Sequence, residues 1–228
     1  MDIFTDASLN DKEKIAGIGM VFVLPMASTN MQYAHTYLMT DNIETAELFA
    51  ISEAIAHAHR FQPKTIRLYS DSVGALRKLQ RIFHHPDQRQ IHTINNSAQK
   101  EILYRISTSF EQMGDVDCSF YLIRGHQTRP TEFSAGYYNM LADREASSGR
   151  LFGEMLLKSA YATMKNSLGY PQIKITPHPN TQIVAPAQIS FHYEELVKNP
   201  KLVSRYAKHK KENTFRRANQ NASRGRHG

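Results

Sequence analysis

Residues 1–8 (MDIFTDAS) combine a strand-like run with a single carboxylate. Ile3, Phe4 and Thr5 are β-branched or aromatic, which favours a pleated surface. Asp6 follows them at once, although Asp is depleted in strands. Taken alone, the pattern favours a strand that ends at Asp6 and begins a turn there. The role of Asp6 therefore has to be inferred together with the rest of the chain.

The length and composition predict one substantial domain with an appendage, or two small domains. The chain has 228 residues, and its hydrophobic fraction of 41% is enough for a core. It contains no apolar run long enough to span a bilayer and no secretory signal pattern at its start. We therefore expect a soluble, unexported, cytoplasmic protein with no membrane partner. The single cysteine, Cys118, excludes a disulfide framework.

The positive charge gathers at one end of the chain. The net charge is +7, but residues 165–228 alone carry +9, so the first 164 residues sum to −2. A near-neutral globular part with a basic end is typical of a protein that acts on a polyanion, most often nucleic acid. The alternative is a tail that only aids solubility. We predict a globular domain over 1–164 and a basic, Pro-interrupted, partly disordered extension over 165–228.

The periodicity of the apolar residues predicts an α/β fold. Residues 15–24 and 32–39 are expected to form an antiparallel meander with the first strand, and Gly17 and Gly19 indicate a close backbone approach or a bulge. We expect a mixed five-stranded sheet, three antiparallel strands followed by parallel strands, flanked by helices. The remaining expected elements are a helix over 45–60, a strand over 65–69, a helix from Val73, a helix over about 91–113, a strand over 117–123 and a helix that begins near Asn139.

Three further acids and one histidine occupy particular places in these elements. Glu47 lies one turn before Ile51, at the edge of the buried helix face. Asp71 lies at the carboxyl end of a strand, where open α/β sheets build their sites. Each has an ordinary explanation, since Glu47 and Asp143 suit a helix start, Asp71 suits a helix N-cap and His126 suits a surface loop.

Considered jointly, the order Asp, Glu, Asp, His, Asp resembles the ribonuclease H type 1 family over roughly residues 1–155. The order of strands and helices agrees with that family as well. The residues that carry the resemblance are Asp6 in DIFTDAS, Glu47 in TAELFAISEAI, Asp71 in LYSDS, His126 in IRGHQ and Asp143 in NMLADREAS.

This resemblance implies the ligands and the chemistry of a two-metal nuclease. Asp6, Glu47, Asp71 and Asp143 look like the metal ligands, and the implied cofactor is a pair of Mg²⁺ ions, with Mn²⁺ as an alternative. Hard cations take oxygen ligands, and a pair of ions stabilises both the attacking and the leaving oxygen of a phosphodiester. His126 is similar to the family's mobile histidine, which helps to move protons or to release product.

The sequence also departs from the family where the substrate is bound. Family members commonly have Gly where Ala7 stands, and only Asn42 remains of an Asn-rich run that contacts the RNA strand. The Trp-bearing basic protrusion of the bacterial enzymes is absent, since the chain has no Trp. The basic extension could supply phosphate contacts instead. The candidate nucleic-acid-binding residues are Asn42, Lys208, Lys210, Lys211, Arg216 and Arg217.

The leading interpretation is a Mg²⁺-dependent endonuclease that hydrolyses the RNA strand of an RNA–DNA hybrid. One alternative is a nuclease of the same fold that acts on structured or double-stranded RNA or on DNA. Another is a nucleic-acid-binding module of a larger assembly, with a protein partner bound through the extension. Four intact acids argue against a binding-only domain, because such a domain has no physical need for a repulsive cluster.

Overall fold

The structure is a computed structural model that describes residues 1–24, 31–84, 91, 93–125, 130–163 and 184–193. The chain divides into two compact units, Met1–His192 and Tyr193–Gly228, and every helix and strand described here belongs to the first. None of the described helices is both long enough and apolar enough to cross a bilayer.

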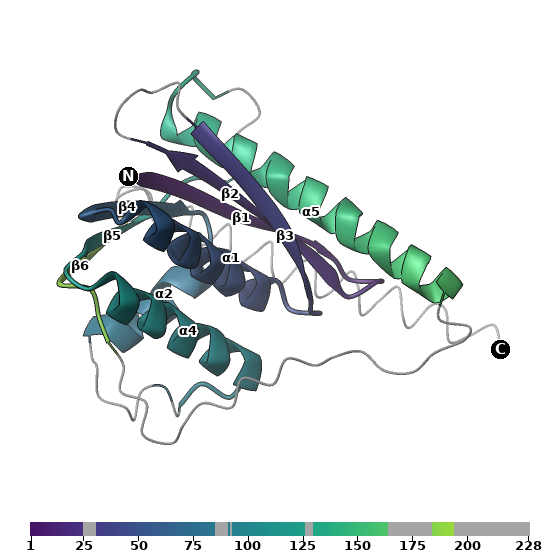
Figure 1. Cartoon of the computed structure of the whole chain (residues 1–228), viewed down its shortest axis with the longest axis horizontal. Helices are drawn as coiled ribbons and strands as arrows, with labels where there is room; N and C mark the ends of the chain where they lie inside the picture. Colours follow the sequence, from purple (N-terminus) through teal and green to yellow (C-terminus); the bar gives the residue numbers. More distant parts are fainter. Residues whose placement is uncertain (25–30, 85–90, 92, 126–129, 164–183, 194–228) are drawn as a thin grey trace, which may run out of the picture. The chain divides into compact units, whose positions relative to one another are not determined.

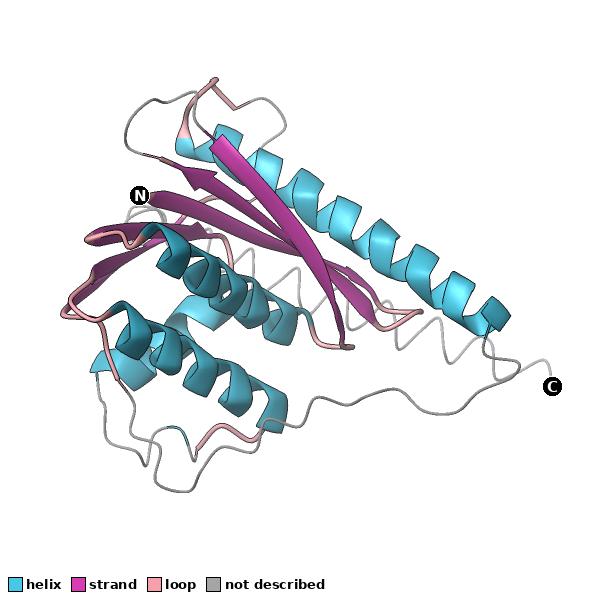
Figure 2. Ribbon diagram, viewed as in Figure 1, coloured by secondary structure: helices cyan, strands magenta, loops and turns pink. Residues whose placement is uncertain are grey.

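The described part of the chain is built on a six-stranded mixed sheet with the strand order β3-β2-β1-β4-β5-β6 (Figures 1 and 2). β1 and β3 are both antiparallel to β2, whereas β1, β4, β5 and β6 run parallel to one another. The strands are β1 (Asp2–Asn10), β2 (Ile15–Val23), β3 (Met31–Met39), β4 (Thr65–Ser70), β5 (Asp117–Leu122) and β6 (Gln188–His192).

Helices cover both faces of this sheet. One long helix packs on β1, β2 and β3, and α1 packs on β1 and β2 from the opposite face, next to α2 and α4 (Figure 1). β2, which lies between β3 and β1, is buried almost throughout, as its uninterrupted apolar sequence requires when both faces are covered. The helices are α1 (Ile43–Ala58), the short 3₁₀ helix η1 (His59–Phe61), α2 (Val73–His84), α4 (Ser97–Met113) and the long α5 (Ala135–Thr163).

Two glycines of β2 let α5 lie directly on the sheet. A Cβ atom at Gly17 would overlap the backbone of Ala146 and Arg150, and one at Gly19 would overlap the backbone of Ala142 and Ala146. The predicted close backbone approach at these glycines is therefore confirmed. Because only glycine leaves this room, β2 sets the height of α5 above the sheet.

The predicted number of strands, five, is wrong. The sixth strand, Gln188–His192, lies beyond the predicted domain boundary at residue 164 and pairs in parallel with β5. Its Phe191 ring stacks on Phe120 of β5, with the ring centroids 5.0 Å apart. The alternation of Ile189 and Phe191 with polar residues is the signal for this strand, and the Pro-interrupted, basic context of the segment concealed it.

Two helices begin four or more residues away from the position that the sequence pattern predicts. α4 begins at Ser97 rather than near residue 91, because the Oδ1 of Asn96 accepts the N–H of Gln99 at 3.1 Å and caps the helix. α5 begins at Ala135 rather than near Asn139. At the start of α5, the Oγ of Ser134 accepts the N–H of Tyr137 at 3.2 Å.

Candidate active site

Asp6 lies in the middle of β1, as the resemblance requires, and does not end the strand. It pairs with Gly19 of β2, and its side chain is only 3% exposed. The strand continues to Asn10, so the backbone on both sides of the acid is held in the sheet. A buried carboxylate in such a place needs a partner that compensates for the lost hydration.

Two more carboxylates meet Asp6 at this point. Glu47 projects from the second turn of α1 and is 7% exposed, and Asp71 follows directly after the last residue of β4. One carboxylate oxygen from each of the three acids lies within 4.8 Å of the other two. The structure therefore brings together three of the four acids singled out in the sequence.

An ion pair joins α1, which carries Glu47, to α2, which follows Asp71 in the chain. Lys78 Nζ of α2 forms an ion pair with Glu44 Oε1 of α1 at 2.5 Å. Gly74 leaves room for this contact, because a Cβ atom there would overlap the Glu44 carboxylate. The pair is partly buried, so solvent screens it less than an exposed pair.

The environment of the cluster opposes the ionisation of its two buried acids. Burial, with the charges of Asp71 and Asp143, raises the pKa of Asp6 to about 8. Burial, with the charges of Asp6 and Asp71, raises the pKa of Glu47 well above its usual range. A hydrogen bond from the Ala7 N–H, 2.7 Å from Asp6 Oδ1, opposes the rise at Asp6.

The cluster has the properties of a site for a hard divalent cation. Within the described part of the chain, Asp6 Oδ2 and Glu47 Oε2 are buried and have no hydrogen-bond partner. Such unpaired buried oxygens are costly unless a cation or a proton compensates for them. All the donors are carboxylate oxygens, which Mg²⁺ and Mn²⁺ prefer. The residues present therefore fit a metal centre held by Asp6, Glu47 and Asp71.

Asp143 lies outside this tight group but close enough to act on it. Its charge contributes to the raised pKa of both Asp6 and Glu47. It follows Ala142, whose backbone rests against Gly19, the residue that pairs with Asp6. The contact between α5 and β2 therefore places Asp143 at the level of the cluster.

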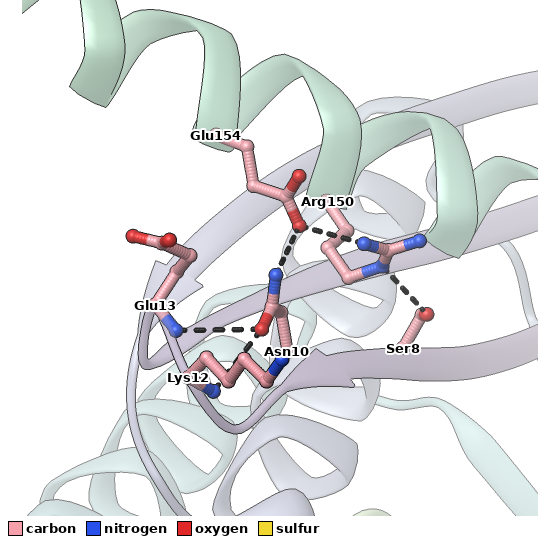
Figure 3. Close-up of polar contacts among 6 residues, drawn as sticks. All are labelled: Ser8, Asn10, Lys12, Glu13, Arg150 and Glu154. Atoms are coloured by element: carbon pink, nitrogen blue, oxygen red, sulfur yellow. Dashed lines mark hydrogen bonds and ion pairs between the residues drawn. The ribbon is translucent and has the colours of Figure 1, made fainter.

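A hydrogen-bonded network joins β1 to α5 (Figure 3). Arg150 donates from Nε to Ser8 Oγ at 3.2 Å and from Nη1 to Glu154 Oε1 at 2.6 Å. Asn10 Nδ2 donates to the same Glu154 oxygen at 2.7 Å. The hydrogen bonds from Asn10 and Arg150 lower the pKa of Glu154. This network ties together the two elements that carry the first and the last of the four acids.

Sequence reasoning missed one residue that touches the cluster. Gly125, in the loop after β5, lies so close to Asp71 that a Cβ atom would overlap its Oδ2. The only sequence signal for Gly125 was its position next to the candidate histidine. A glycine alone does not indicate which residue its backbone contacts.

Of the remaining candidate residues, the structure describes only Asn42. Asn42 is the N-cap of α1, and its Oδ1 accepts the N–H of Thr45 at 3.1 Å. It has a structural role, and its role in binding nucleic acid stays a prediction. Several candidates lie outside the described residues, namely His126, Lys208, Lys210, Lys211, Arg216 and Arg217.

The fold and the site define an α/β domain with a buried carboxylate cluster of the kind that holds divalent cations. The family model for RNase H matches residues 1–150. The chain belongs to the RNase H family, as the sequence resemblance indicated.

Solved structures share the fold at low sequence identity. LC11-RNase H1 in complex with RNA/DNA hybrid is 17% identical, with a TM-score of 0.51, over 67% of this chain and 98% of that one. The N-terminal RNase H domain of rv2228c from Mycobacterium tuberculosis, solved as a maltose-binding-protein fusion, is 12% identical. Its TM-score is 0.50, over 68% of this chain and 98% of that one. Comparison with curated protein sequences gave no match.

The raised pKa of Asp6 predicts how the stability of the metal-free protein depends on pH. The folded protein keeps this proton up to a pH of about 8, whereas the unfolded chain releases it near pH ~3.9. The folded state therefore binds more protons between these values, so the free energy of unfolding falls as pH rises from about 4 to about 8. In EDTA, the free energy of unfolding of Asp6→Asn should fall less steeply with pH than that of wild type. The variant should be more stable than wild type at about pH 8.

Urea unfolding at a series of pH values measures this effect. The difference between the two proteins reports the titration of Asp6 together with its effect on the neighbouring Glu47, and it should grow as pH rises through this window. A constant difference, or one that shrinks with rising pH, would contradict the assigned protonation of the cluster.

Proposed function

We propose that this protein is a divalent-metal-dependent endonuclease that hydrolyses the RNA strand of RNA–DNA hybrids. The observation that carries the proposal is the convergence of Asp6, Glu47 and Asp71, with unpaired buried oxygens, inside an RNase H family domain. The structure of LC11-RNase H1 with an RNA/DNA hybrid, which shares this fold, supports the choice of substrate.

Asp6, Glu47, Asp71 and Asp143 would hold the metal, as two Mg²⁺ ions or as Mn²⁺. When bound, these ions supply charge stabilisation to the attacking and leaving oxygens of the phosphodiester. Asp6 and Glu47 are the buried anchors, because they are 3% and 7% exposed. Asp71 and Asp143 are more exposed. The scissile phosphate therefore approaches from the side of these two acids.

The protein's own contribution is a rigid, water-poor arrangement of anions. Asp6 is fixed by the strand pairing of β1, and Glu47 by a helix that is capped at Asn42 and paired with α2. Sites that are organised before the reaction lose little free energy to reorganisation during it. The raised pKa values of Asp6 and Glu47 mean that binding a cation displaces protons from them.

We assign to His126 the movement of a proton, or the release of product, at this centre. The support comes from its neighbour, because Gly125 lies against the Asp71 carboxylate. A histidine suits this role, since its intrinsic pKa of ~6.5 lets it take up and release a proton near neutral pH.

The function is tested by a cleavage assay in Mg²⁺ with RNA–DNA hybrid, duplex RNA, duplex DNA and single strands. We expect cleavage of the RNA strand in the hybrid, and a loss of ~10³-fold or more in Asp71→Asn, because metal stabilisation of the transition state amounts to several kcal/mol. Asp115→Asn is the matched control, since Asp115 is an exposed acid outside the cluster. Near wild-type turnover in Asp71→Asn would refute the metal site, whereas a preference for duplex RNA or DNA would refute only the substrate.

His126→Ala separates proton transfer from metal binding. We expect turnover to fall by ~10²–10⁴-fold, the usual contribution of general acid–base assistance, while the Mg²⁺ affinity stays at the wild-type value. The measurements are turnover on the hybrid and calorimetric titration with Mg²⁺. A loss of Mg²⁺ affinity as large as that of Asp6→Asn would make His126 a ligand instead.

A further inference from the structure

One face of α2 carries a row of basic side chains that take no part in the carboxylate cluster. Arg77, Arg81 and His84 recur at steps of four and three residues, so they lie on the same side of the helix. All three side chains are exposed, and together with Gln80 they line a surface hollow of about 580 Å³. No acidic residue occurs anywhere in α2.

In the part of the chain that the structure describes, no acidic side chain is paired with the arginines of this basic row, which consists of Arg77, Arg81 and His84. Among the described residues, neither arginine forms an ion pair, whereas Lys78 on another side of α2 is paired with Glu44. Like charges one helical turn apart repel each other and destabilise the helix. A bound anion would compensate for the repulsion between these positive charges, so the row favours anion binding.

The length of the row fits a polyanion better than a small anion. From Arg77 to His84 the helix advances about 10 Å, at 1.5 Å per residue. The phosphates of one strand of a duplex follow each other every ~3.4 Å along its axis, so the row spans about three of them. The guanidinium groups suit this partner, because their planar fork makes paired hydrogen bonds to phosphate oxygens.

The row is also continuous with the candidate active site. α2 begins two residues after Asp71, and Arg77 lies only about 6 Å further along the helix than Val73. At the other end of the row, the His84 ring lies 5.3 Å from the ring of Phe191 in β6. A strand bound at the carboxylates can therefore continue along α2 toward β6.

We propose that Arg77, Arg81 and His84 bind consecutive backbone phosphates of the nucleic acid on which the carboxylate cluster acts. This binding surface rests on the proposed function. The surface would contact the sugar-phosphate backbone and not the bases, so it would contribute affinity and positioning without sequence preference.

The test compares three forms of the full-length chain by the salt dependence of hybrid binding in EDTA: wild type, R77A/R81A and R77K/R81K. Losing two phosphate contacts should make the slope of log K against log salt shallower by about 2, since each contact on a duplex contributes about −0.9. R77K/R81K keeps both charges and should restore most of the slope. The matched control is R60A/K64A, which removes two exposed cations between α1 and β4 and should leave the slope unchanged.

The outcomes separate this proposal from the function on which it rests. A wild-type slope in R77A/R81A, or an equal change in R60A/K64A, would overturn the binding surface while the nuclease assignment stands. Binding of duplex RNA or DNA in place of the hybrid, with the slope still dependent on the two arginines, would overturn the substrate and support the surface. No binding of any nucleic acid would overturn both.

Discussion

Electrostatic repulsion among Asp6, Glu47 and Asp71 is the constraint on which this structure depends. Three carboxylates with oxygens within 4.8 Å of one another, two of them buried, do not all ionise without a cation. Burial, together with this repulsion, raises the pKa of both Asp6 and Glu47. A fold that only had to be stable would replace the buried acids with apolar residues. The cluster therefore indicates a functional demand that the rest of the domain supports.

The surrounding structure keeps this unfavourable arrangement in place from two sides of the sheet. On one side, the Glu44–Lys78 ion pair joins the helices next to the cluster. On the other side, α5 rests on Gly19, and the network around Arg150 ties the same helix to the far end of β1. Each contact lies outside the cluster but fixes an element that carries one of its acids. This is the support that a preorganised site needs.

Much of the site could be predicted from the sequence, and what could not has physical reasons. Asp6 was recognised as a strand residue because the joint order of acids outweighed the local turn signal, and Gly19 because a glycine within a strand often marks close packing. Gly125 could not be recognised, since its importance lies in a tertiary contact with Asp71. The strand Gln188–His192 was missed because its short apolar alternation lies in a Pro-interrupted, basic segment, and its partner β5 is distant in the sequence.

The central claim is that these carboxylates exchange protons for a divalent cation. Calorimetric titration of Mg²⁺ into the full chain near pH 7, in two buffers of different ionisation enthalpy, measures both binding and the protons released. Because the pKa of Asp6 is about 8, the account predicts Mg²⁺ binding with net proton release, and a smaller release in Asp6→Asn. Absence of Mg²⁺ binding, or binding that releases no protons at this pH, would contradict it.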